Sequence, residues 1–315
     1  MTSSTARTTR RPRCSDAARL RGDPLIGTAP PATRWLLIEQ DSGWGREALT
    51  SLDAPAVVRS QFERALDETG SRLQLIRRPG RKSQEMSAAP NRWYVVDVGP
   101  GVVAHGTVDD GWESVVTALH APASEQAASL RSRFVLVCTN GRHDMCCAVR
   151  GRPVAAALAE RWPADVWECT HTGGDRFAGN VVVLPDGAIY GSLDPDSALA
   201  VLEDHESGRH GSPRIGEHLR GYVGFRAVEQ AARAELASQL SEAGLPPWDR
   251  TRVAATSSRD GDSWICSLTL DGQPFATVSG HDEIRPAQHL TCSATAVSRA
   301  RVPVVDEVHP ASRPV

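Results

Sequence analysis

Two stretches of the chain show the same order of apolar and amphipathic segments. In the first, an apolar run over residues 34–40 precedes residues 53–69, whose apolar side chains recur at helical spacing. Three strand-like runs follow, over residues 73–78, 92–99 and 101–108, and an amphipathic segment begins near Asp110. The pattern predicts strand, helix, three strands, helix.

The second stretch repeats this order. The apolar run 133–138 is followed by a short helix over residues 152–162, with Pro153 near its first turn. Asp194 is a suitable N-cap for the closing helix, which runs to residue 205. Between the two helices the pattern predicts three strands, over residues 165–170, 180–185 and 188–193, with a Pro-Asp-Gly turn before the last.

This order of elements is the one that a thioredoxin-like α/β sandwich requires, because a parallel strand–helix–strand unit meets an antiparallel hairpin. We therefore expect an α/β protein with two thioredoxin-like α/β sandwich units in tandem and a small C-terminal α+β extension. The expected boundaries are a disordered tail over 1–24, a first unit without cysteines over 25–128, a second unit over 129–225 and the extension over 226–315.

The junction between the two units is expected within residues 121–132. In the extension, residues 228–240 have the pattern of an amphipathic helix, and residues 263–280 that of a hairpin with an Asp-Gly turn. Residues 300–315 are expected to form a loose tail after a final strand.

Composition and charge exclude several classes of function. The formal charge of −3 over 315 residues indicates no nucleic acid partner. No stretch approaches the 18 or more apolar residues that a membrane span needs, and the basic start of the chain lacks the apolar core of a secretory signal. Together with clustered cysteines, this favours a reducing, cytoplasmic location.

Four of the seven cysteines gather in one part of the chain: Cys138, Cys146, Cys147 and Cys169. Cys14, Cys266 and Cys292 are scattered, and we interpret the last two as core residues. Adjacent cysteines generally cannot point at one ion, so only one of Cys146 and Cys147 is expected to be a ligand. A Cys-x-x-C motif of the thioredoxin type is absent here.

A second motif lies after the strand at 165–170. His171 and Asp175 frame a Thr-Gly-Gly loop, in which the glycines free the backbone to bend around a bulky group. Cys169 lies two residues before His171, which places both on one side of an extended strand. Cys169 is therefore a reserve candidate, as is Cys146.

The two motifs, CTNGRHDMCCAVRG and HTGGDRFAGNVVVLPDGAIYG, resemble the sucrase/ferredoxin-like family, a branch of the thioredoxin-like [2Fe-2S] ferredoxins. The resemblance implies a thioredoxin-like ferredoxin domain over 129–225, with a [2Fe-2S] cluster held by Cys138, Cys147, His171 and Asp175. In similar proteins the loop usually reads His-x-Gly-Gly-His, so Asp175 stands where a second histidine is expected.

A carboxylate is a less natural ligand than imidazole for iron in a sulfide cluster. Three possibilities remain open for the fourth ligand. Asp175 binds the iron directly, Cys169 or His143 takes its place, or the site is incompletely coordinated. An Asp ligand restores one negative charge, which predicts a reduction potential below that of a two-histidine relative.

The function implied is one-electron transfer with a redox partner protein, a reductase or an electron acceptor, rather than an enzyme with its own substrate. Four arginines flank the motifs and could meet an acidic partner: Arg142, Arg150, Arg152 and Arg176. The alternatives are a thiol oxidoreductase that uses Cys138 or Cys147 as nucleophile, and a structural zinc-binding module. The sequence does not indicate an oligomeric state.

Overall fold

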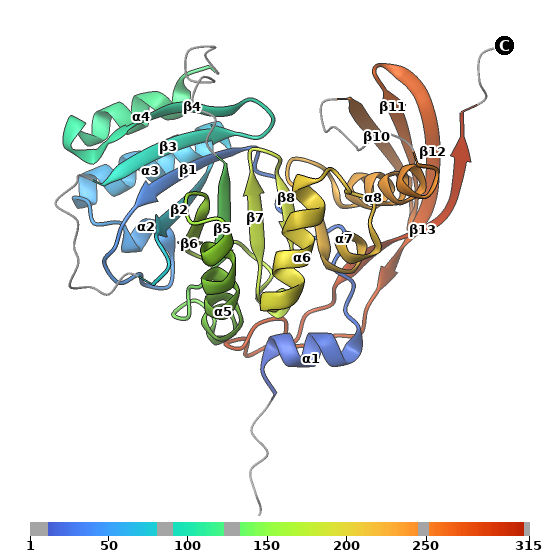
Figure 1. Ribbon diagram of the computed structural model, residues 1–315, viewed down its shortest axis with the longest axis horizontal. Coiled ribbons are helices and arrows are strands. Elements are labelled where there is room, and N and C mark those ends of the chain that lie inside the picture. Colours follow the sequence, from blue (N-terminus) through green and yellow to red (C-terminus); the bar gives the residue numbers. More distant parts are fainter. Residues whose placement is uncertain (1–11, 81–90, 123–132, 245–251, 312–315) are drawn as a thin grey trace, which may run out of the picture.

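The computed structural model describes residues 12–80, 91–122, 133–244 and 252–311 (Figure 1). Most of the expected junction, residues 123–132, lies outside the described residues. Within them, no helix is long and apolar enough to cross a membrane.

The main element is a nine-stranded mixed sheet. The strands of its first half are β1 (Arg34–Glu39), β2 (Arg72–Arg77), β3 (Arg92–Asp97) and β4 (Gly101–Thr107). Those of its second half are β5 (Phe134–Cys138), β6 (Val166–Cys169), β7 (Val181–Leu184), β8 (Ala188–Tyr190) and β9 (Leu219–Tyr222). The order across the sheet is β4-β3-β1-β2-β6-β5-β7-β8-β9.

The two halves have the same connectivity. In the first, β1 pairs in parallel with β2 and antiparallel with β3, which pairs with β4. In the second, β5 pairs in parallel with β6 and antiparallel with β7, which pairs with β8. Antiparallel pairing of β2 with β6 joins the halves through equivalent strands. The predicted α/β class is confirmed, while the thioredoxin-like description of each half stays a prediction.

Helices cover one face of the sheet (Figure 1). The sheet is curled, so that side chains from its two halves pack together on the other face. The covering helices are α3 (Ala56–Thr69), α4 (Trp112–His120), α5 (Met145–Arg161) and α6 (Pro195–Glu206). On the opposite face the rings of Tyr94 and Phe134 lie 5.0 Å apart, although three strands separate β3 from β5. In a flat sheet these strands would be about 19 Å apart, so the sheet is strongly curled.

Helix α5 begins earlier than the sequence pattern indicated. Asp144 caps it, because its side chain accepts a hydrogen bond of 2.8 Å from the backbone N–H of Cys146. The predicted start at residue 152 is therefore wrong, and Pro153 lies inside the helix. The consequence is that Cys146 and Cys147 occupy the first turn of a helix rather than a loop.

The C-terminal part contains a helix and a four-stranded antiparallel sheet in sequence order. Its elements are α8 (Ala227–Glu242), β10 (Val253–Asp260), β11 (Ser263–Leu270), β12 (Gln273–Ile284) and β13 (Arg301–Pro310). Asp271 and Gly272 have positive φ angles of 50° and 78°, which confirms the predicted Asp-Gly hairpin. The expected loose tail is wrong over residues 301–310, because they pair with β12.

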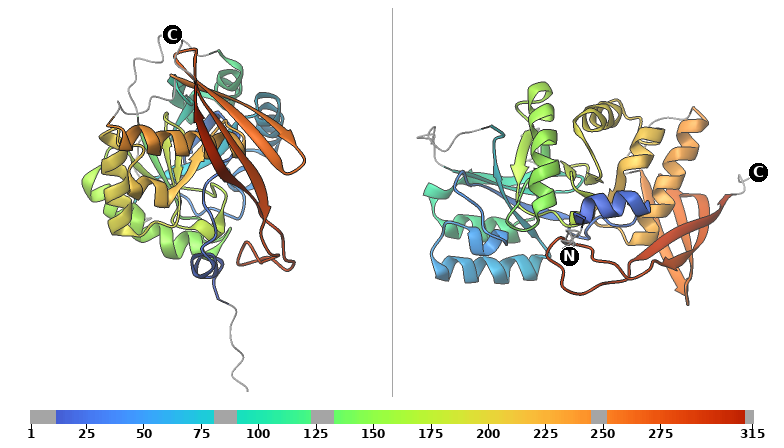
Figure 2. Two further views of the ribbon diagram at one scale, coloured as in Figure 1. Left: turned by 90° about the vertical axis from the view of Figure 1, so that its right-hand side faces the viewer. Right: turned by 90° about the horizontal axis from the view of Figure 1, so that it is seen from below.

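A short helix, α1 (Cys14–Arg21), lies within the expected disordered tail. The prediction of disorder is therefore wrong for this segment. The helix is polar and has little apolar periodicity, so its stability comes from tertiary contacts. In Figure 2, α1 lies beside the loop of residues 285–300 that connects β12 with β13. The remaining short helices are α2 (Ala48–Ser51), η1 (Val108–Asp110), η3 (Asp175–Phe177) and α7 (Pro213–His218).

Candidate metal centre

Three of the predicted ligands converge at one edge of the second half. Cys138 is the last residue of β5, Cys147 lies in the first turn of α5, and His171 follows β6. Their ligand atoms all lie within 4.8 Å of one another. The carboxyl ends of the parallel strands β5 and β6 meet at this edge, which explains why residues 33 positions apart come together.

Gly151 permits the close approach of α5 to β5. A Cβ atom at this position would lie 2.0 Å from the carbonyl oxygen of Cys138, well inside any real contact. The helix can therefore bring Cys147 next to Cys138 only because residue 151 has no side chain. This glycine belongs to the Ala-x-x-Gly helix entry of the first motif.

The loop of His171 is fixed from several sides. Its carbonyl oxygen accepts hydrogen bonds from Arg72 at 3.1 Å and from Gln74 at 3.2 Å, both on β2 of the first half. The guanidinium group of Arg220 donates to the carbonyl oxygen of Gly173 at 2.8 Å and to Asn180 Oδ1 at 3.0 Å. The cysteine-free first half thus supports a loop of the second.

Asp175 and His143 lie in the same group. The Asp175 carboxylate is 3% exposed and accepts a hydrogen bond of 3.4 Å from the Cys147 thiol. Its Oδ1 lies 2.9 Å from His171 Nδ1, and its Oδ2 lies 3.7 Å from His143 Nε2. The His143 and His171 rings stack with centroids 3.5 Å apart. One ligand atom each from His143, His171 and Asp175 also lie within 4.8 Å of one another.

The electrostatics of the site favour anionic sulfur and carboxylate beside a cationic imidazole. A hydrogen bond from the Cys147 thiol lowers the pKa of Cys138, because its effect is larger than that of burial, and His171 lowers this pKa further. The same hydrogen bond raises the pKa of Cys147. Burial alone would lower the pKa of His171, but Asp175 and Cys138 raise it to about 9. Burial alone would raise the pKa of Asp175, but His171 and then His143 lower it.

The donor set fits a metal or an iron–sulfur cluster. Two buried sulfurs, two imidazoles and one carboxylate converge, and both thiolate and imidazole are known iron ligands in such clusters. His171 Nδ1 lies 2.9 Å from Asp175 Oδ1. Histidines that bind metal through one ring nitrogen commonly pair the other with a carboxylate in this way.

The two reserve cysteines have different surroundings. Cys169 pairs with Cys138 on the neighbouring strand and is fully buried, and burial raises its pKa. Among the described residues it belongs to neither group of converging ligand atoms. The Cys146 sulfur contacts Cys14 and Cys292, whereas Cys147 faces Cys138 and Asp175. Neighbouring cysteines therefore point to different places, as the sequence predicted.

Two of the four flanking arginines make ion pairs within the chain. Arg150 pairs with Asp16 of α1, and Arg176 Nε lies 3.7 Å from Asp23. Sequence reasoning missed Arg220, which is fully buried and whose pKa burial lowers to about 9. It lies 45 positions after Asp175 with no motif to mark it, so only the fold could reveal it.

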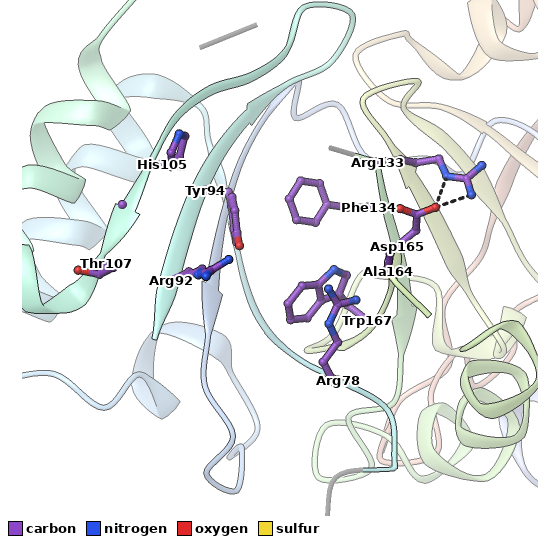
Figure 3. A pocket seen from close by; sticks show the side chains of 11 residues that line it. Arg78, Arg92, Tyr94, His105, Thr107, Arg133, Phe134, Ala164, Asp165 and Trp167 are labelled. Atoms are coloured by element: carbon purple, nitrogen blue, oxygen red, sulfur yellow. Dashed lines mark hydrogen bonds and ion pairs between the residues drawn. The ribbon is translucent and has the colours of Figure 1, made fainter. Parts of the chain in front are cut away.

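A pocket of about 470 Å³ opens elsewhere, between β3–β4 and β5–β6 (Figure 3). Tyr94, Phe134 and Trp167 line it together with three arginines, of which Arg133 pairs with Asp165 at 2.7 Å. None of the converging sulfur or imidazole ligands lines this pocket. It is therefore separate from the candidate metal centre.

Fold and site together define an α/β protein with buried groups of cysteine, histidine and aspartate that could hold metal ions. The sucrase/ferredoxin-like family model matches residues 25–221, more than half of the 315 residues. The chain belongs to the sucrase/ferredoxin-like family, as its two motifs predicted. Searches of curated proteins and of solved structures gave no match.

Proposed function

We propose that this protein is a one-electron carrier whose [2Fe-2S] cluster is bound at the ends of β5 and β6. The observation that carries the proposal is the convergence of Cys138, Cys147 and His171 within 4.8 Å. Membership of a ferredoxin-like family supports it. The proposal includes a separate redox partner protein and a cytoplasmic site of action.

His143 is the fourth ligand that the surroundings favour. Imidazole binds iron in a sulfide cluster better than a carboxylate does, and the His143 ring already stacks on His171. Its Nδ1 atom lies 3.1 Å from the carbonyl oxygen of Arg46, so a hydrogen bond there would leave Nε2 free to bind metal. The set would then be Cys138, Cys147, His143 and His171.

Asp175 then has the role of an orienting carboxylate. It is buried between the two imidazoles and within reach of the Cys147 thiol. A carboxylate that pairs with the second ring nitrogen of a metal-binding histidine, as Asp175 does with His171 Nδ1, fixes the ring and raises its basicity. The competing assignment, in which Asp175 itself ligates, predicts a lower reduction potential because it adds a negative charge to the cluster.

When bound, the cluster supplies reversible uptake of one electron. The residues of the chain provide the surroundings. Cys138 and Cys147 are 1% and 0% exposed, so bulk water is kept from the two sulfurs. The partly buried Arg72 and the buried Arg220 lie close enough to Cys138 to offset the negative charge of its thiolate. His171 holds a proton in the metal-free site, next to Asp175.

The thiol oxidoreductase alternative is disfavoured by burial. A nucleophilic cysteine must be reached by its substrate, yet both sulfurs lie inside the protein. The zinc alternative remains chemically compatible with the donors, since zinc accepts thiolate, imidazole and carboxylate. Metal content separates it from the cluster proposal.

The test is visible absorption and EPR of anaerobically purified protein before and after reduction by dithionite. We expect a coloured protein with iron and inorganic sulfide in equal amounts and an EPR signal only after reduction. A colourless protein that takes up no iron during anaerobic reconstitution would overturn the proposal. Protein without iron that holds a zinc ion lost in Cys138→Ser would assign this site to the zinc module.

Two variants identify the fourth ligand. His143→Ala should lose most of the iron, whereas Asp175→Asn should keep the cluster at a higher potential, because a nearby negative charge is removed. His281→Ala is the control, since His281 is exposed and pairs with Asp306 on the C-terminal sheet. The opposite pattern, with cluster loss only in Asp175→Asn, would make Asp175 the ligand.

A further inference from the structure

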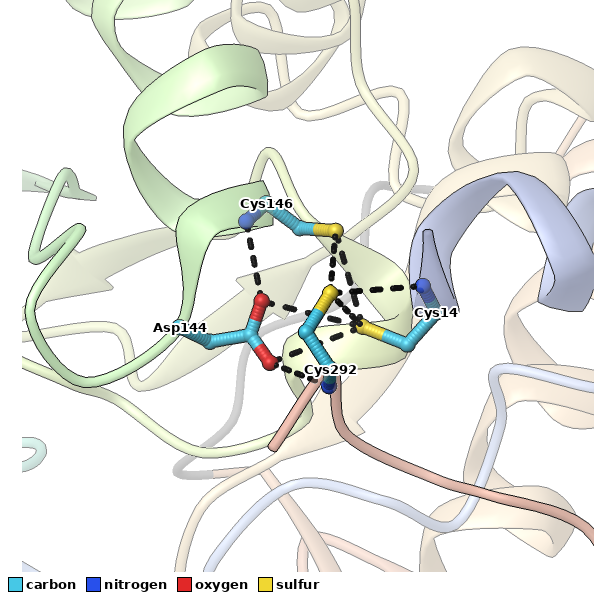
Figure 4. Close-up of side chains that lie close together, drawn as sticks. All are labelled: Cys14, Asp144, Cys146 and Cys292. Carbon is cyan, nitrogen blue, oxygen red and sulfur yellow. Dashed lines mark hydrogen bonds between the residues drawn. The ribbon is translucent and has the colours of Figure 1, made fainter. Parts of the chain in front are cut away.

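Figure 4 shows a second group of sulfur atoms, whose member Cys146 directly precedes Cys147 of the candidate cluster site in the chain. Cys14 of α1, Cys146 of α5 and Cys292 of the β12–β13 loop meet around the carboxylate of Asp144. The three sulfur–sulfur distances are 3.5 Å for Cys14–Cys146, 3.4 Å for Cys146–Cys292 and 3.6 Å for Cys14–Cys292. The sulfurs thus form a nearly equilateral triangle.

The carboxylate completes a tetrahedron. Asp144 Oδ2 and Oδ1 lie 3.7 Å and 3.8 Å from the sulfur of Cys14. Four ligands at zinc bond lengths of about 2.0–2.3 Å are separated from one another by about 3.5–3.8 Å. The three sulfur–sulfur distances and the distance from Asp144 to Cys14 are therefore close to the edges of a zinc tetrahedron, and all four donors lie within 4.8 Å of one another.

Disulfide bonding does not explain this arrangement. A disulfide requires sulfurs about 2.05 Å apart, which none of the three pairs approaches, and it would join only two of the three sulfurs. The Cys14 and Cys146 side chains are 4% and 0% exposed. Three thiols at nearly equal distances are the geometry of a shared ion.

The surroundings of the donors also suit a metal. Asp144 Oδ1 accepts the N–H of Cys146 at 2.8 Å, and Oδ2 accepts the N–H of Cys292 at 2.7 Å. Because each carboxylate oxygen has two lone pairs, one remains on each for an ion. The N–H of Cys14 points to the sulfur of Cys292 at 3.5 Å, as backbone amides often do around metal-bound thiolates.

We propose that Cys14, Cys146, Cys292 and Asp144 bind one Zn²⁺ ion in a structural site distinct from the cluster site. The ion joins three segments that are 132 and 146 residues apart in sequence. Crosslinks that close such long loops restrict the unfolded chain strongly. The ion would hold α1 and the β12–β13 loop against the first turn of α5, where Cys147 reaches into the cluster site.

The test is zinc and iron analysis of the full chain, with zinc K-edge absorption spectroscopy. We expect about one zinc per chain in a shell of three sulfurs at about 2.3 Å and one oxygen. Cys14→Ser combined with Cys292→Ser should lower zinc at least about tenfold while iron stays bound. Cys138→Ser should lose iron and keep zinc, so the two proposals fail separately.

Cys266→Ser is the matched control, because Cys266 is buried in β11 away from both groups and should leave zinc unchanged. Protein stripped with a chelator should rebind Zn²⁺, and α1 amides should exchange hydrogen faster without it. Zinc retained in the double variant, no zinc uptake by the stripped wild type, or a disulfide among these cysteines would each overturn the proposal.

Discussion

Substituting Gly151 by alanine tests whether close contact between α5 and β5 builds the cluster site. The added Cβ would lie 2.0 Å from the carbonyl oxygen of Cys138 and 3.1 Å from its carbonyl carbon. Real Cβ contacts essentially never fall below 3.0 Å, so helix and strand must separate by at least 1.0 Å. Because both atoms belong to backbone, no flexible side chain can absorb the shift.

The expected magnitude follows from two opposing effects. Overpacking against rigid backbone costs about 3 kcal/mol. Alanine in a helix interior gains about 1 kcal/mol over glycine. We therefore expect Gly151→Ala to lose about 2 kcal/mol of unfolding free energy, and Cys147 to move away from Cys138, which lowers iron content.

The assay is urea unfolding followed by far-UV circular dichroism, together with iron analysis. Gly216→Ala in α7 is the control, because its Cβ would meet nothing within 4 Å. It should gain about 0.5–1 kcal/mol, since only the helix propensity changes. If Gly151→Ala were as stable as Gly216→Ala and bound iron normally, the contact would not have the role assigned to it.

Two further predictions concern buried charge. Arg220→Met removes the donor to buried oxygens of Gly173 and Asn180 and should cost about 3–5 kcal/mol in urea unfolding. Arg214→Met, whose side chain is 66% exposed, should change stability by less than about 0.5 kcal/mol, and equal effects of the two would contradict this role. Burial and the neighbouring His205 lower the pKa of His210 from 6.5 to about 4. The unfolded chain therefore binds more protons at this residue than the folded chain, and the free energy of unfolding falls as the pH drops from 6.5 towards 4. Between pH 7 and pH 4.5, wild type should lose about 2 kcal/mol more than His210→Gln, and parallel pH profiles would disprove it.

The sequence was most informative where side-chain pattern is local. Short continuous apolar runs located β1 to β8, because most of these strands are buried on both faces of the sheet. The Asp194 cap and the Asp-Gly hairpin were also readable, since both depend on neighbouring residues. The start of α5 was missed, because polar residues and Pro153 in its first half hide the helical period.

The second sulfur group shows the limit of local pattern. Cys292 was interpreted as core and Cys14 placed in a disordered tail, since neither has a ligand within ordinary motif spacing. Their sulfurs meet Cys146 only because α1 and the β12–β13 loop pack against α5 (Figure 2).

The sequence by itself determined the α/β class and, through its two motifs, the family and three residues that converge, Cys138, Cys147 and His171. Tertiary structure alone decided that His143 stacks on His171, that Arg220 supports their loop, and that Cys14 and Cys292 meet. Those contacts join residues far apart in the chain, and their proximity depends on how the sheet curls and how the chain ends pack.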